Sequence, residues 1–145
     1  MQLIRTDGGR AACGYTGSAG DCVTRAIAIV AEMPYHQVYA DLAWINLNMP
    51  KTRKRATAGI YSARQGMYVG SVLFKRYMMD LGFSWTPTMW IGSGCKVHLN
   101  DGELPNGRLV VSLSKHYTAV IDGIICDTHD PSRNGTRCVY GYWRI

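Results

Sequence analysis

Two alternating apolar runs joined by Asp122-Gly123 constrain the fold of this 145-residue chain more than any other feature. The first run spans residues 114–121 and the second spans residues 124–128. An Asp-Gly pair between two such runs predicts a tight hairpin, because a type I′ turn needs a positive φ at both central residues. We therefore expect an antiparallel pair of strands here.

The position of this turn determines which residues lie opposite one another in the hairpin. Ala119 is expected opposite Cys126, and Thr118 opposite Asp127. Because side chains alternate between the two faces of a strand, His116, Thr118 and Asp127 share one face, while Cys126 points to the other. His116 and Asp127 are diagonal neighbours on that face, which places the carboxylate within reach of the imidazole.

A second motif lies near the start of the chain, where Gly20-Asp21-Cys22 precedes an apolar-rich stretch. This stretch predicts a helix over residues 22–33, with Asp21 capping it by accepting from the backbone N–H of Thr24. Cys22 then lies on the first turn, where unpaired N–H groups and the positive end of the helix dipole stabilise a thiolate. Such surroundings lower a cysteine pKa from about 8.5 to roughly 3.5–7.5, although the charge of Asp21 opposes this shift.

The order of these motifs resembles the papain-like cysteine peptidase superfamily. The closest likeness is to its compact bacterial and phage members, in the bacteriocin-processing and transglutaminase-like branches. It rests on the helix-borne Cys22 and on the run from His116 to Asp127, and it covers the order of elements along most of the chain. The resemblance implies that Cys22 is the nucleophile, His116 the general base, and Asp127 the residue that orients the imidazole.

The same resemblance implies a thiol-dependent hydrolase or acyl transferase that acts on an amide or thioester-type bond. A phage or bacterial cysteine peptidase with a protein or peptide substrate, such as a host protein, fits this likeness. Neither the substrate nor the choice between hydrolysis and acyl transfer follows from these residues.

Two positions of the proposed site remain open at this stage. Papain-like enzymes usually carry a Gln a few residues before the nucleophile to stabilise the oxyanion, and Thr16 stands there instead. Thr16 and Ser18 can each donate one hydrogen bond, and the backbone N–H of Cys22 can donate another. Asp130 competes with Asp127 as third member, because a bulge would turn it to the same face.

The rest of the chain divides into helices followed by strands. Apolar spacing and Gly and Pro positions predict further helices at 35–48 and 70–81 and strands at 84–90, 108–114, 115–121, 124–128 and 137–143. The segment 91–107 is loop-like. This order predicts one α+β domain over residues 1–145, papain-like, with N-terminal helices carrying the Cys packed on a C-terminal antiparallel β-sheet carrying His and Asp.

Composition narrows the class of protein. Hydrophobic residues make up 47% and charged residues 18%, which is typical of a folded globular chain. The longest apolar run, residues 26–31, is too short to span a membrane, and residues 1–7 contain no apolar signal segment. The odd count of five cysteines, with no CxxC pair, favours reduced thiols and a cytoplasmic protein, in the host cytoplasm if the chain is phage-encoded.

Metal binding is the main rival use of the cysteines and histidines. Cys95 and His98 form a close combination, and Cys126 with His129 is equally isolated, so no set of pairs stands at a spacing typical of zinc ligands. We therefore expect neither a metal nor another cofactor.

A net charge of +6 supports a different function. Lys51, Arg53, Lys54 and Arg55 form a basic cluster that could contact the phosphates of a nucleic acid or select an acidic substrate. A solvated loop is the simpler interpretation of these charges. The alternative to an enzyme is thus a non-catalytic binding protein, either an inactive papain-like scaffold or a basic nucleic-acid-binding module.

Overall fold

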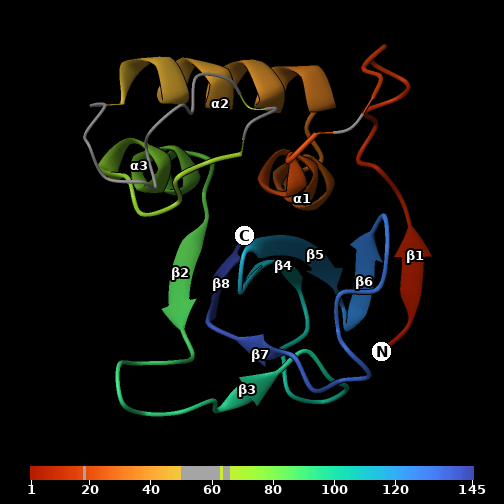
Figure 1. Ribbon diagram of the computed structural model, residues 1–145, viewed down its shortest axis with the longest axis vertical. Helices are drawn as coiled ribbons and strands as arrows, with labels where there is room; N and C mark the ends of the chain where they lie inside the picture. Colours follow the sequence, from red (N-terminus) through yellow and green to blue (C-terminus); the bar gives the residue numbers. More distant parts are fainter. Residues whose placement is uncertain (18, 50–62, 64–65) are drawn as a thin grey trace.

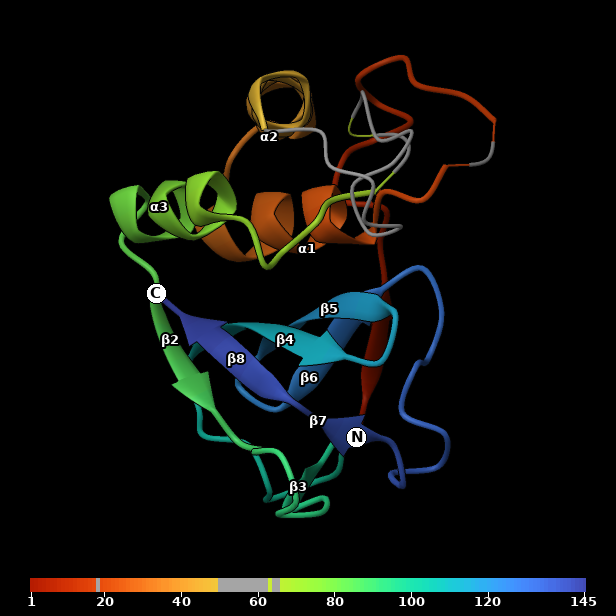
Figure 2. The ribbon, with the colours of Figure 1, turned by 60° about the vertical axis from the view of Figure 1, so that its left-hand side comes forward.

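The computed structural model describes residues 1–17, 19–49, 63 and 66–145. Within them, three helices lie over one face of a six-stranded sheet, and a two-stranded sheet lies at the end farther from the helices (Figure 1, Figure 2). The helices are α1 (Cys22–Ala31), α2 (Tyr35–Asn48) and α3 (Val72–Asp80). The strands are β1 (Leu3–Arg5), β2 (Ser84–Pro87), β3 (Val97–His98), β4 (Arg108–Leu113), β5 (His116–Ile121), β6 (Ile124–Asp127), β7 (Cys138–Val139) and β8 (Gly141–Arg144). The expected α+β class is confirmed.

The six-stranded sheet is mixed, with strand order β1-β6-β5-β4-β8-β2. β1 runs parallel to β6, and the other neighbours are antiparallel. The expectation of a purely antiparallel sheet is therefore wrong. β1 has only three residues, too few to show an alternating pattern, and it forms because the edge of β6 offers unpaired backbone groups. The N–H of Ile125, for example, donates to the carbonyl of Gln2 at 2.9 Å.

The hairpin between β5 and β6 forms as its sequence predicts. Asp122 and Gly123 have φ values of 48° and 79°, the two positive angles that the turn requires. Ala119 pairs with Cys126, so the predicted register is confirmed.

The helices follow the predicted segments, with shorter ends. α1 stops at Ala31 because Glu32 adopts a left-handed φ of 55°, from which its N–H binds the carbonyl of Ala28. α3 starts at Val72 because Ser71 is its N-cap and accepts from the N–H of Phe74 at 3.1 Å. α2 has the predicted bounds.

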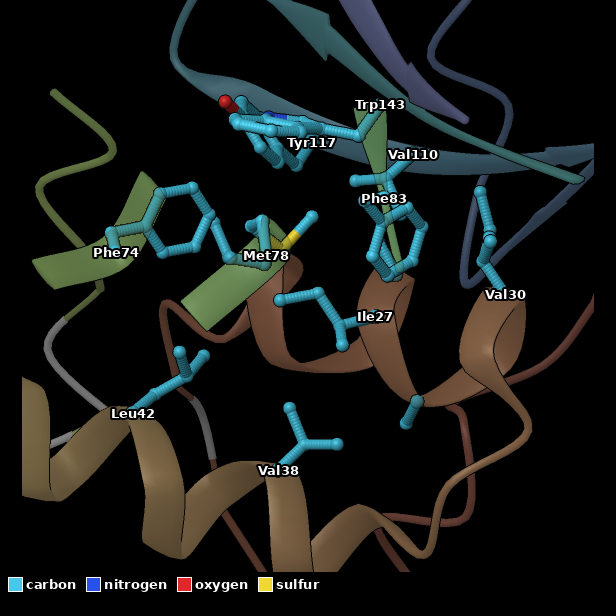
Figure 3. Close-up of a cluster of buried hydrophobic side chains, with 14 of the residues drawn as sticks. Ile27, Val30, Val38, Leu42, Phe74, Met78, Phe83, Val110, Tyr117 and Trp143 are labelled. Carbon is cyan, nitrogen blue, oxygen red and sulfur yellow. The ribbon is translucent and has the colours of Figure 1, made fainter. Parts of the chain in front are cut away.

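Apolar side chains cover both faces of the six-stranded sheet. The larger cluster lies between the sheet and the helices, where Ile27 of α1 and Met78 of α3 approach Tyr117 and Trp143 of the sheet (Figure 3). A second cluster on the opposite face contains Leu99, Leu109, Val111, Leu113, Val120, Ile125 and Val139. Burial on both faces holds the β5–β6 hairpin rigidly, and the proposed site residues lie at one end of it.

A disulfide joins Cys95 to Cys138, which are 43 residues apart in the sequence. The expectation that all five thiols are reduced is therefore wrong for this pair. The sequence carries no spacing signal for it, because the two cysteines meet only when β3 pairs with β7, with His98 opposite Cys138. Cys13, Cys22 and Cys126 are free.

Among the described residues, no helix is both long enough and apolar enough to cross a membrane.

Candidate active site

Cys22 is the first residue of α1, as predicted, and its side chain is half-buried. The helix packs along β5, and this contact brings its first turn to the start of that strand. The backbone N–H of Tyr117, the second residue of β5, helps to lower the pKa of the Cys22 thiol. The thiol thus lies at a helix N-terminus and over the end of a buried strand.

His116 and Asp127 lie side by side on the hairpin. The Nε2 atom of His116, the first residue of β5, is 2.8 Å from Oδ2 of Asp127, the last residue of β6. Cys126 points into the helix-side core instead, as predicted. Asp130, the alternative third member, is exposed and accepts from the N–H of Ser132 at 2.8 Å. The contact with His116 is therefore made by Asp127.

Several groups besides His116 hold the buried carboxylate of Asp127. The hydroxyl of Thr118 donates to Oδ2 at 2.7 Å, and the N–H of Thr128 donates to Oδ1 at 2.7 Å. The Nη2 atom of Arg25 lies 3.6 Å from Oδ1. These contacts leave the carboxylate little freedom, so it fixes the orientation of the imidazole ring.

The thiol of Cys22 and the imidazole of His116 line the same cleft, and each shifts the pKa of the other. Nε2 of the same ring is bound by Asp127, so one imidazole interacts with both the thiol and the carboxylate. Burial by itself raises the pKa of Cys22, but the bond to His116, the N–H of Tyr117 and the positive charges of His116 and Arg25 outweigh it, and the pKa falls below its usual value.

The pKa values of His116 and Asp127 shift in the directions that favour their charged forms. Burial alone would lower the pKa of His116, yet its bonds to Asp127 and Cys22 raise it to about 9. Burial alone would raise the pKa of Asp127, yet the bonds from His116 and Thr118 lower it to about 2. These directions favour a thiolate beside an imidazolium at neutral pH, the state in which a cysteine is nucleophilic.

Asp21 does not cap α1, contrary to expectation. It makes no side-chain cap hydrogen bond, because other partners take its carboxylate oxygens. The Tyr35 hydroxyl donates to Oδ2 at 2.5 Å, Nε of Arg10 lies 3.3 Å from the same atom, and Nη1 of Arg25 binds Oδ1. Two guanidinium groups thus balance the buried charge that stands next to the thiol.

Arg25 is one of two residues of the candidate site that the sequence interpretation missed. Its guanidinium bridges Asp21, one turn earlier on α1, and Asp127 on the hairpin. The four-residue spacing from Asp21 is a signal for the first contact. No sequence signal points to the second. His129 was also missed, and its ring lies against that of His116 with centroids 5.2 Å apart.

A cleft of about 410 Å³ opens onto Cys22 and His116. Gly20 and Gly66 lie along it together with Ser112, Lys115 and Tyr140. Its position gives a carbonyl group access to the sulfur.

The predicted oxyanion donors are not brought to this cleft in the described part of the chain. Thr16 is exposed, does not line the cleft, and binds Arg10 through its backbone carbonyl at 3.1 Å. Ser18 lies outside the described residues. The backbone N–H of Cys22 remains as the candidate from the sequence interpretation.

The basic cluster of Lys51, Arg53, Lys54 and Arg55 also lies outside the described residues. Within the described chain, no group of three or more His, Cys, Asp or Glu side chains is arranged to hold a metal ion.

Comparison with known proteins gives no relative: no family model, no curated protein and no solved structure matches this chain.

Proposed function

We propose that this chain is a papain-like thiol enzyme that cleaves or transfers an acyl group held in an amide or thioester-type bond. The observation that carries the proposal is the position of Cys22 in one cleft with a histidine whose Nε2 is bound by a buried aspartate. A nucleophile, an acid–base partner and an orienting group in this order form the constellation used for covalent acyl transfer. The cleft beside Cys22 gives an extended substrate room to approach.

The reaction proceeds in two balanced halves. The sulfur of Cys22 forms a bond to the carbonyl carbon, and an electron pair of the C=O bond moves to oxygen. When this intermediate collapses, the bond to the amine or thiol breaks, and the leaving group takes a proton from the imidazolium of His116. Water or an amine then attacks the thioester, gives its proton to His116, and releases Cys22 as the thiolate.

The rate of Cys22 alkylation by iodoacetamide, followed by mass spectrometry, tests this proposal. At about pH 6 we expect Cys22 to react roughly tenfold or more faster than N-acetylcysteine, because its pKa is lowered. His116→Ala removes the hydrogen bond and the positive charge, so its Cys22 reacts slowly at that pH. Above about pH 10 both proteins are ionised at Cys22 and the rates converge.

His36→Ala is the matched control, because His36 is an exposed histidine on α2. It should leave the rate at Cys22 unchanged. Acylation by p-nitrophenyl acetate gives the second measurement: one acetyl group should appear on Cys22 and then be lost to water. An alkylation rate at about pH 6 that equals that of N-acetylcysteine and is insensitive to His116→Ala contradicts the proposal and favours a non-catalytic scaffold.

A further inference from the structure

An apolar pocket of about 550 Å³ adjoins the cleft that contains Cys22. The two hollows share Val69, Ser112, Tyr117 and Tyr140 among their lining residues, so they lie directly beside each other. A peptide with one side chain in the pocket can therefore extend toward the thiol. The volume lies within the range typical of pockets that bind small ligands.

Five of the eleven described residues that line this pocket are aromatic: Phe83, Trp85, Tyr117, Tyr140 and Trp143. Trp85 and Tyr140 remain 41% and 39% exposed, so the pocket presents unpaired apolar surface to solvent. Aromatic walls pack well against another ring or a bulky aliphatic side chain.

The charged groups at the two hollows are all basic. Lys75 of α3 lines the pocket and Lys115 lines the cleft, while no Asp or Glu of the described chain lines either. Lys75 is exposed and forms no ion pair with another described residue. Its ammonium group is thus available to a carboxylate of a bound molecule.

We propose that the pocket binds a bulky apolar side chain of an acidic peptide, with a neighbouring carboxylate of that peptide paired to Lys75. The inference rests on the proposed function, since it assigns the substrate class of the same site. The apolar side chain contributes the larger share of the affinity because it is removed from water against the aromatic walls. The ion pair, which stays near the surface, sets the preference for acidic neighbours.

Binding of blocked dipeptides to the Cys22→Ala protein tests this inference without any reaction. The probes are N-acetylated, C-amidated Phe-Glu, Glu-Phe, Phe-Lys and Ala-Glu, followed through the indole N–H signals in NMR spectra. We expect the Trp85 and Trp143 signals to shift, and those of Trp44 and Trp90 to stay. Phe-Glu or Glu-Phe should bind about tenfold or more tightly than Ala-Glu, and roughly two- to fivefold more tightly than Phe-Lys.

Lys75→Glu should reverse the ranking of the acidic and basic peptides. Arg76→Glu is the matched control, because Arg76 is the next residue of α3 and lines a different hollow beside Asp41 and Asp80. It should preserve the ranking. Trp85→Ala should weaken every Phe-containing peptide, whereas Trp44→Ala should not.

Equal binding of all four peptides, or a ranking that Lys75→Glu leaves unchanged, overturns the inference. Binding of dodecanoate in the pocket, with no binding of any peptide, also overturns the inference. It would indicate that the ligand of the pocket is a lipid-like acyl chain. The peptide-binding test can fail while the proposed function holds. Alkylation of Cys22 by iodoacetamide, which tests the proposed function, needs no molecule in the pocket.

Discussion

The buried carboxylate of Asp21 stands one residue before Cys22, where its charge opposes formation of a thiolate. Arg10 and Arg25 both approach this carboxylate, and Arg25 also approaches Asp127. At the scale of single residues, the thiol is therefore close to a network of two carboxylates and two guanidinium groups. The negative charge of Asp21 does not act on it alone. Arg25 joins the helix half of the site to the hairpin half.

Replacing Arg25 should show both roles of this network. Arg25→Gln leaves two buried carboxylates with less compensation, so we expect the free energy of unfolding to fall by about 3 kcal/mol. The pKa of Cys22 should rise, because the positive charge of Arg25 helps to lower it. Urea denaturation and the pH profile of iodoacetamide alkylation measure the two effects.

Arg25→Lys is the conservative variant for the same test. It retains the positive charge, so the pH profile of alkylation should return toward that of the unmodified protein. Stability should recover only in part, because an ammonium cannot reproduce the two-sided contact of a guanidinium. An alkylation profile that is identical in Arg25→Gln and the unmodified protein would show that Arg25 has no effect on the thiol.

At the scale of elements, α1 is fixed to the sheet at both of its ends. Its N-terminus contacts β5 at the site, and its C-terminus is held by Arg108 of β4. Arg108 donates to the carbonyls of Val30 and Ile29 at 2.8 and 2.9 Å, and so satisfies acceptors that the last helical turn leaves unpaired.

Arg108→Met should lower the free energy of unfolding by about 1–2 kcal/mol, because two helix carbonyls lose a charged donor at a partly exposed position. Urea denaturation measures this change. Arg76→Met, at an exposed position of α3, should change stability by less than about 0.5 kcal/mol. An equal loss in both variants would show that the contact with the α1 carbonyls contributes nothing.

Some of these elements could be predicted from the sequence, and others could not. The β5–β6 hairpin was predicted with its register, because Asp122-Gly123 specifies the turn locally and a one-residue slip would exchange the side chains of the two faces. β1 was not predicted, because a strand of three residues carries too little pattern and depends on the edge of β6.

At the scale of the whole molecule, the Cys95–Cys138 disulfide holds the β3–β7 pair together. It closes a segment of the chain that would otherwise explore many conformations when unfolded. We expect Cys95→Ser/Cys138→Ser to lower the free energy of unfolding by about 2–4 kcal/mol.

Calorimetry with and without a reductant measures this effect. The reductant should shift the unmodified protein toward the double variant and should leave the double variant unchanged. The alkylation rate of Cys22 should be the same in both, because neither cysteine of the disulfide lines the cleft that contains Cys22. A double variant as stable as the unmodified protein would show that the β3–β7 pair needs no cross-link.

The sequence by itself determined the hairpin, its register and the shared face of His116 and Asp127, together with the helix that begins at Cys22. These features depend on turn geometry, alternation and local φ preferences, all of which act between residues close in the chain. Only the tertiary structure decided that Cys22 meets His116, that Arg25 reaches Asp127, and that an apolar pocket adjoins the cleft. Such contacts depend on how distant elements pack, and no local pattern encodes that arrangement.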